Sequence, residues 1–282
     1  MELKEALTQL ETAQKELDPQ FGALRMTMGA LKPAIRLSKD DKPDALPMQK
    51  ALLKLETAVT EMQNETVIDT GNLETAVSAF ATVTNAALND LAFDFAKDLR
   101  DEFTKQGVTM DGRPPTLIVG MLVFKMDIAA RKGQWLYGKE PLTSPIPLSR
   151  YRIFQTYKQQ VKRIVDRKLD ADFLPNLQTA WQKVMDKRKQ RPSGGRVNII
   201  EVYSQFTLDL QGNRFWNQPS RRTFKEYERE FFVRDMVLAH EQGDAPFRLG
   251  VATKVQADKA NRSIWIPKTA VDGDYYSDIT FD

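Results

Sequence analysis

The segment from Leu73 to Gly107 restricts the possible folds more than any other part of the sequence. Its apolar residues recur at helical spacing, and Gly107 is a good residue to end a helix. This pattern predicts a helix of about 33 residues, which would be about 50 Å long. Since helices of this length usually pack in bundles or coiled coils, we expect an N-terminal helical bundle. The apolar positions are Leu73, Val77, Phe80, Ala87, Leu91, Phe95, Leu99 and Phe103.

Five leucines near the N-terminus lie seven residues apart, at Leu3, Leu10, Leu17, Leu24 and Leu31. Such a heptad repeat can form a leucine zipper, which also needs a second apolar position in each heptad. With the leucines at position a, the d positions are small or polar, namely Ala6, Ala13, Gln20, Thr27 and Ala34. Because Pro19 would interrupt a helix and Asp18 can cap one, the sequence predicts two short helices, 2–17 and 19–31, on one core. A dimeric zipper is the alternative.

The charge is distributed unevenly along the chain. Residues 1–111 contain 12 basic and 19 acidic side chains, a net charge of −7. This half also includes a further predicted helix at 48–62, which follows a polar loop. Residues 112–282 contain 29 basic and 19 acidic side chains, a net charge of +10. This asymmetry predicts two modules with different partners, an acidic helical bundle at 1–111 and a basic module at 112–282.

The second half of the sequence mixes patterns typical of strands with patterns typical of helices. The expected elements are a β-hairpin around a turn at 131–133, a helix capped by Ser149, a helix over about 171–190, a strand over 196–210, a helix over 219–240 and short strands to the end. RPSGG at 191–195 is the expected hinge. Because no regular βαβ repeat is present, the predicted fold class is α+β.

The composition excludes several kinds of chemistry. The chain has no cysteine, so disulfides, thiolate nucleophiles and cysteine-bound zinc or iron–sulfur sites are excluded. Histidine-based catalysis would have to use His240, which lies at the end of a predicted helix and would complement the helix dipole. The acidic start is unlike a signal peptide, and the longest apolar run, TLIVGMLVF, is too short for a membrane helix. We therefore expect a cytoplasmic protein without metal or cofactor.

Two motifs resemble ligand sites but lack essential parts. GQWLYGK at 133–139 fits the spacing of a phosphate-binding loop, but Glu140 and Pro141 stand where a hydroxyl residue and a helix are needed. The bulky centre of this segment suits a strand better. VDGD at 271–274 could bind a cation, although an Asp-Gly-Asp segment is typical of a turn.

Glu201 and Asp209 are the candidate catalytic residues. They lie eight residues apart on the predicted strand, so their side chains would share one face. Paired carboxylates serve metal-dependent nucleases and glycosidases. The acid-x-Lys pair that accompanies many such nuclease sites is not found on a predicted strand. A metal-dependent hydrolase is therefore an alternative, while the failed motifs favour a protein that is not an enzyme.

The densest cluster of charge lies in residues 149–196, which hold 13 basic and 4 acidic side chains. Lys158 and Lys162 are one helical turn apart, as are Lys183 and Lys187, so each pair shares a helix face. Such a surface binds phosphates with little sequence preference, although it could also be a solvated face or meet an acidic protein. The predicted nucleic-acid-binding residues are Arg150, Arg152, Lys158, Lys162, Arg163, Arg167, Lys183, Lys187, Arg188, Arg191, Arg221 and Arg222.

Together these features favour a non-enzymatic subunit of a cytoplasmic multi-protein assembly. The helical module would bind copies of itself or other subunits, and the basic module would contact DNA or RNA. Two alternatives stay open, a metal-dependent hydrolase and a scaffold that binds only protein. No motif is specific enough to indicate a family.

Overall fold

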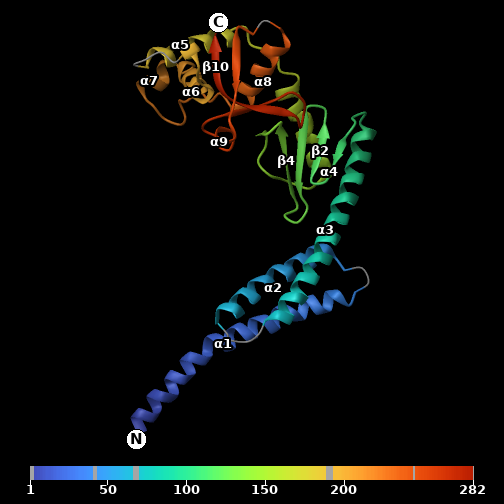
Figure 1. The fold of residues 1–282 in the computed structure, drawn as a ribbon. Helices are drawn as coiled ribbons and strands as arrows, with labels where there is room; N and C mark the ends of the chain where they lie inside the picture. Colours follow the sequence, from blue (N-terminus) through green and yellow to red (C-terminus); the bar gives the residue numbers. More distant parts are fainter. Residues whose placement is uncertain (1–2, 41–42, 66–69, 189–192, 244, 282) are drawn as a thin grey trace. The chain divides into compact units, whose positions relative to one another are not determined.

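The computed structural model describes residues 3–40, 43–65, 70–188, 193–243 and 245–281 (Figure 1). Helices and strands are mixed along the chain, which confirms the α+β class. The chain forms two compact units: unit 1 comprises Met1–Asp98 and Ile128–Ala130, and unit 2 comprises Leu99–Asp127 and Arg131–Asp282. This division falls inside a helix, whereas the composition changes near residue 111. The predicted functional boundary at 111 and 112 therefore stays a prediction.

Unit 1 is built from α1 (Leu3–Ser38), α2 (Ala45–Glu65) and most of α3 (Gly71–Lys105). The structure confirms the long helix and the helix at 48–62, whose predicted apolar face is buried. Ala30 and Ala34 of α1 pack against α2, and Phe80 of α3 packs on the same cluster. Because alanine side chains are short, this face of α1 can approach α2 closely.

The predicted break at Pro19 is wrong, because α1 runs through both Pro19 and Pro33 as one helix. A proline inside a helix removes a backbone hydrogen bond and costs about 3 kcal/mol. At Pro33 the packing of neighbouring alanines on α2 offsets this cost. At Pro19 the surrounding sequence is rich in strong helix formers such as Leu, Lys, Glu and Gln. The heptad leucines Leu10 and Leu17 are exposed and do not form the core of unit 1.

Unit 2 contains two antiparallel sheets in its described residues. The first pairs its strands in the order β1-β2-β3-β4-β5, with β6 on β4: β1 (Asp111–Arg113), β2 (Thr116–Val119), β3 (Leu122–Asp127), β4 (Lys132–Tyr137), β5 (Glu140–Pro141) and β6 (Ile146–Pro147). The second has β10 between β7 and β8, with β9 also on β10: β7 (Val197–Asn198), β8 (Phe247–Val251), β9 (Ile264–Pro267) and β10 (Gly273–Phe281). The predicted hairpin is confirmed as β3–β4, and the predicted C-terminal strands are confirmed as β8, β9 and β10.

The helices of unit 2 are α4 (Arg150–Gln160) with a π-helical continuation (Val161–Val165), α5 (Phe173–Asp186), α6 (Ile199–Asp209), α7 (Asn213–Asn217), α8 (Arg229–Glu241) and α9 (Lys254–Ala257). Ser149 caps α4 as predicted, because its hydroxyl accepts a hydrogen bond from the backbone N–H of Arg152. The helix predicted over 219–240 begins only at Arg229. Before it, the backbone N–H of Lys225 donates to the side chain of Gln211 at 2.8 Å, which a regular helix would not allow.

An aromatic cluster in unit 2 holds α4 against the first sheet. The ring of Phe103, at the end of α3, lies 5.0 Å from that of Phe154 and 6.3 Å from that of Trp135. The indole N–H of Trp135 donates to the carbonyl of Ile153 at 3.3 Å. Because this face of α4 is fixed in the core, the opposite face is left to solvent. No helix in the described part of the chain combines the length and apolar character needed to span a membrane.

Candidate nucleic-acid interface

The predicted nucleic-acid-binding residues occupy several elements of unit 2. Arg150, Arg152 and Lys158 lie on α4, Lys162 and Arg163 on its π-helical continuation, and Arg167 shortly after it. Lys183 lies on α5, Lys187 and Arg188 follow its end, and Arg221 and Arg222 lie between α7 and α8. Arg191 and Pro192, the first two residues of the predicted hinge at 191–195, lie outside the described residues.

The strand predicted over 196–210 is wrong, because all but its first residues form α6. The β-branched residues at 197–200 favour a strand locally. However, Asn198 caps a helix through a bond from the N–H of Ile200, and the next apolar side chains, Val202 and Phe206, are buried at helical spacing. The candidate catalytic residues Glu201 and Asp209 therefore lie on a helix and not on one face of a strand.

Each candidate catalytic carboxylate is paired with a predicted phosphate-binding cation. Arg188 binds Glu201 at 2.7 Å, and Lys183 binds Asp209 at 2.8 Å. Between these two pairs, Lys187 donates to the amide oxygen of Gln205 at 2.5 Å. We call these three contacts the α5–α6 ladder. Its two acids neutralise Lys183 and Arg188, so this face is less positive than the sequence of α5 alone suggests. Among the described residues, no group of three or more His, Cys, Asp or Glu could hold a metal ion.

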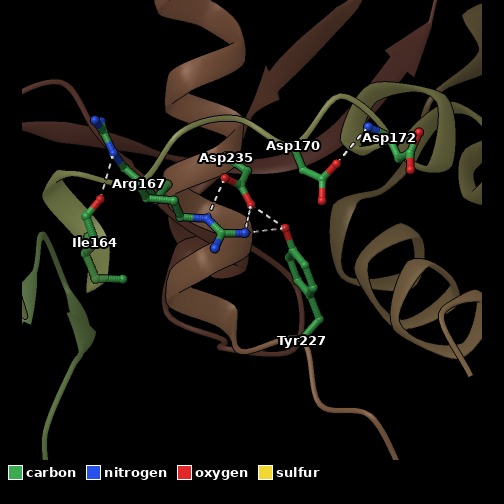
Figure 2. A network of polar contacts seen from close by, with 7 residues as sticks. Ile164, Arg167, Asp170, Asp172, Tyr227 and Asp235 are labelled. Atoms are coloured by element: carbon green, nitrogen blue, oxygen red, sulfur yellow. Dashed lines mark hydrogen bonds and ion pairs between the residues drawn. The ribbon is translucent and has the colours of Figure 1, made fainter. Parts of the chain in front are cut away.

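Arg167 is held inside unit 2 by a polar network (Figure 2). Its Nε and one Nη donate to the two carboxylate oxygens of Asp235 at 2.8 and 2.7 Å, and the same Nη donates to the Tyr227 hydroxyl at 3.2 Å. The Tyr227 hydroxyl in turn donates to Asp235, which has no exposed surface. The guanidinium also lies 4.5 Å from the ring centre of Phe231. Arg167 therefore serves the fold and is not available to a phosphate.

The same network perturbs the acidity of its members. Burial and the hydrogen bond to Asp235 raise the pKa of Tyr227 far above its ordinary value. The hydrogen bond to Asp235 also raises the pKa of the Arg167 guanidinium. Both groups consequently keep their protons throughout the neutral range. Tyr227 is a hydrogen-bond donor to Asp235 and is not a base that could activate water.

Arg163 is also engaged within unit 2. It forms ion pairs with Glu228 and, at 3.0 Å, with Glu230. Its guanidinium lies 4.6 Å from the ring centre of Phe231. Five of the predicted cations that the structure describes therefore bind other side chains of the protein. They are Arg163, Arg167 and the three cations of the α5–α6 ladder, Lys183, Lys187 and Arg188.

A different group of predicted cations is exposed along α4. Arg152, Lys158 and Lys162 are exposed, and in the described part of the chain they form no ion pair with a carboxylate. Lys158 lies 4.6 Å from the ring centre of Phe154, which orients it without neutralising it. The sequence contains no acidic residue between Glu140 and Asp166.

Three further side chains share this surface of α4 and were not predicted from the sequence. Tyr151 is 73% exposed, whereas the neighbouring aromatics Phe154 and Tyr157 pack in the cluster around Phe103. Gln155 and Gln159 lie on the same side of the helix as Tyr151. We call Tyr151, Arg152, Gln155, Lys158, Gln159 and Lys162 the α4 face. The absence of acids over this segment was the signal in the sequence that could have identified it.

The first sheet places two more cations beside the start of α4. Lys132 pairs with Pro147 across β4 and β6, and the N–H of Leu148 donates to the carbonyl of Arg131 at 3.1 Å. Both basic side chains are exposed, although Lys132 also has Asp127 opposite it on β3. Sequence reasoning missed these two cations, because only the pairing of β4 with β6 brings them near Ser149.

The other candidate groups are explained by local contacts. GQWLYGK is largely strand β4, where Trp135 and Tyr137 are fully buried, so it is not a phosphate-binding loop. Lys139 lies 4.3 Å from the ring centre of Tyr275. Asp274 pairs with Lys268 at 2.8 Å, beside a turn closed by bonds to the carbonyl of Asp272.

His240 lies in the last turn of α8, as predicted. Its ring contacts that of Phe247, with the centres 5.0 Å apart. A helix C-terminus favours the charged form of histidine, but partial burial lowers the pKa of His240 below 6.5. Exposed Arg221 and Arg222 lie in a turn between α7 and α8.

No protein family, curated protein or solved structure matches this chain.

Proposed function

We propose that this protein is a non-enzymatic subunit of a larger assembly and that the α4 face contacts nucleic acid. The observation that carries this proposal is the exposed set of Arg152, Lys158 and Lys162, which have no ion-pair partner among the described residues. By contrast, Arg163, Arg167, Lys183 and Arg188 are paired with acids of the protein itself. A cationic surface that the fold leaves unneutralised is suited to phosphates.

The polar side chains of the α4 face agree with binding to a phosphate backbone. Gln155 and Gln159 can donate hydrogen bonds to phosphate or sugar oxygens, which position a nucleic acid without reading its sequence. The exposed ring of Tyr151 can stack on an unpaired base. We therefore expect single-stranded DNA or RNA to bind at least as tightly as a duplex. Arg131 and Lys132 would extend the positive surface beyond the start of α4.

The helices of unit 1 supply the assembly role in this proposal. Several large apolar side chains of α1 are exposed, including Leu10, Leu17 and Phe21. Exposed apolar stripes on helices commonly mark surfaces that bind another protein. A scaffold that binds only protein is the competing function, and the experiment below separates the two.

Fluorescence anisotropy with labelled single- and double-stranded DNA and RNA, across a series of salt concentrations, tests the proposal. Two variants lose the same amount of charge. One replaces Arg152, Lys158 and Lys162 with Gln, and the other replaces Lys183, Lys187 and Arg188 of the α5–α6 ladder with Gln. We expect the first variant to bind at least tenfold more weakly, because three phosphate contacts are lost. The slope of log K against log salt should fall by about 2 for single strands and about 3 for duplexes.

The ladder variant is the matched control, because its cations already have partners on α6. It should keep most of the affinity and the salt dependence of the wild-type protein. Equal losses in the two variants would show that only net charge matters and would contradict a specific α4 face. No binding by the wild-type protein, even at low salt, would favour the scaffold function. Tyr151→Ala should weaken binding to single strands more than to duplexes.

A further inference from the structure

Helix α1 carries two neighbouring apolar stripes; in the described part of the chain one is buried, and of the other only Leu31 packs against the core cluster of unit 1. The inner stripe faces α2 and consists of the buried residues Ala23, Thr27, Ala30 and Ala34. The outer stripe lies about a third of a turn around the helix. Its members alternate at intervals of four and three residues: Leu10, Gln14, Leu17, Phe21, Leu24, Met28, Leu31 and Ile35. This is the spacing of a coiled-coil seam, and it uses the heptad leucines with a better set of partners than positions 6, 13, 20, 27 and 34.

Most of the outer stripe is exposed. Leu10 is 70% exposed, Leu17 62% and Phe21 66%. Further along, Met28 is 58% and Ile35 53% exposed. On a stable helix, such a regular row of large apolar side chains is seldom exposed to solvent. We therefore expect another helix to pack on this row and bury it.

Among the residues whose burial is described, the part of α1 before Pro19 contributes no buried side chain to unit 1. Every residue from Leu10 to Pro19 is exposed, and in Figure 1 this part of the helix continues beyond the end of α2. An isolated helical segment of this length is only marginally stable in water, and Pro19 weakens it further. A partner that covers the outer stripe would supply the missing stabilisation.

Charge identifies the partner. Glu11, Asp18, Arg25 and Lys32 lie seven residues apart along one edge of the outer stripe, and all four are exposed. The edge is acidic in its first half and basic in its second. In an antiparallel pair, this edge faces the same edge of the other helix, so Glu11 meets Lys32 and Asp18 meets Arg25. A parallel pair in register would place the four charges opposite Ala6, Ala13, Gln20 and Thr27, which are uncharged.

The same antiparallel alignment matches the apolar layers. It places Leu10 opposite Ile35, Leu17 opposite Met28, and Phe21 opposite Leu24, and only Gln14 opposite Leu31 is a mixed layer. Each layer occurs twice, because a two-fold axis passes between residues 22 and 23. Residues 10–35 span about 39 Å, which is between three and four heptads. The exposed first half of each α1 would then cover the second half of the other.

We propose that two copies of this chain associate through antiparallel pairing of their α1 outer stripes. This inference rests on the assembly role proposed above and names a second copy as the partner. It does not involve the α4 face. Its failure would leave the nucleic-acid proposal intact, and loss of nucleic-acid binding would leave the dimer intact.

Sedimentation velocity over a range of protein concentrations tests the dimer with charge-reversed variants. One variant carries Glu11→Lys and Asp18→Lys, and the other carries Arg25→Glu and Lys32→Glu. Each alone places like charges opposite one another, so self-association should weaken at least tenfold. An equimolar mixture restores all four opposite-charge pairs and should form a heterodimer at least as tight as the wild type. Glu16→Lys changes a charge away from the stripe and should leave association unchanged.

Orientation can be tested independently by cross-linking, because the chain has no cysteine of its own. Under mild oxidation, Leu10→Cys and Ile35→Cys should each stay monomeric on a non-reducing gel, since the two copies of either cysteine would lie far apart. A mixture of the two variants should form a covalent dimer. Far-UV circular dichroism should confirm that all variants fold, because the substituted residues are exposed. A monomeric wild type, a dimer unaffected by charge reversal, or cross-linking of either cysteine variant alone would overturn the proposal.

Discussion

Asp235 is completely buried, and Arg167 and Tyr227 donate hydrogen bonds to its carboxylate in place of the water that it loses on folding. These partners come from different parts of the chain, with Arg167 lying 68 residues before Asp235. The network ties the segment after α4 to α8. A basic residue that the sequence assigns to phosphate binding thus serves as the partner of a buried acid.

Asp235→Asn should destabilise the protein by about 3 kcal/mol, because it leaves the partly buried Arg167 without its counter-ion. Tyr227→Phe removes the hydrogen bond to the carboxylate and the one accepted from Arg167, and should cost about 1 to 2 kcal/mol. Urea denaturation followed by circular dichroism measures both. Wild-type stability in Asp235→Asn would contradict the buried ion pair.

Because His240 is the only histidine in the chain, its pKa can be measured without overlap and reports on its local burial. We expect the pKa of His240 to lie below 6.5, because contact with Phe247 disfavours the charged ring. At pH values between the pKa of His240 in the folded chain and its higher pKa in the unfolded chain, the unfolded chain binds more protons than the folded one. The contribution of His240 to stability is therefore present above pH 6.5 and is lost as the pH falls through its folded pKa.

One-dimensional NMR across a pH titration can follow the His240 ring protons without interference from another histidine. His240→Gln should remove the corresponding pH dependence of the melting temperature. A measured pKa above 6.5 would mean that the dipole of α8 dominates over burial.

At the scale of elements, α5 and α6 pack through the buried rings of Phe173 and Phe206, and the α5–α6 ladder joins the two helices at partly exposed side chains. Lys183 and Arg188 on one side meet Asp209 and Glu201 on the other. These side chains are partly exposed, so each pair contributes little to stability. Their main effect is to bring complementary helix faces into one register and to remove charge from the surface.

Lys183→Glu should destabilise the protein by no more than about 1 kcal/mol, because it places two acids together at a partly exposed site. Adding Asp209→Lys restores an ion pair with reversed polarity and should recover most of the loss. A double-mutant cycle based on urea denaturation measures the coupling between the two positions. Strictly additive effects would show that the contact contributes nothing.

At the scale of the whole molecule, protection from solvent should differ strongly along the chain. Strands β3 and β4, helix α8 and strand β10 contain fully buried side chains, whereas Leu10 to Pro19 are exposed. In dilute solution we expect the slowest amide hydrogen exchange in the former and the fastest in the first half of α1. Hydrogen exchange with mass spectrometry checks this order. Protection of α1 that rises with protein concentration would support pairing between copies, and uniform protection would contradict the expected order.

Patterns within short segments were predicted well. The helices α2 and α3, the cap at Ser149 and the hairpin β3–β4 all follow from periodicity and local hydrogen bonding. Prediction failed where local signals conflict. The β-branched start of α6 favours a strand, and Pro19 favours a break, but the buried face of α6 and the helix formers around Pro19 outweigh them.

Three features were determined by the sequence itself: the chemistry that the lack of cysteine excludes, the long helix α3, and the change of charge between the two halves. These follow from composition and from periodicity, which are properties of neighbouring residues. Only the tertiary structure decided that Arg167 is paired with the buried Asp235, that Lys183 is paired with Asp209, and that the charged side chains of the α4 face stay exposed. The reason is physical: a cation is neutralised by whatever acid the fold brings to it, and that acid can lie many residues away in the chain.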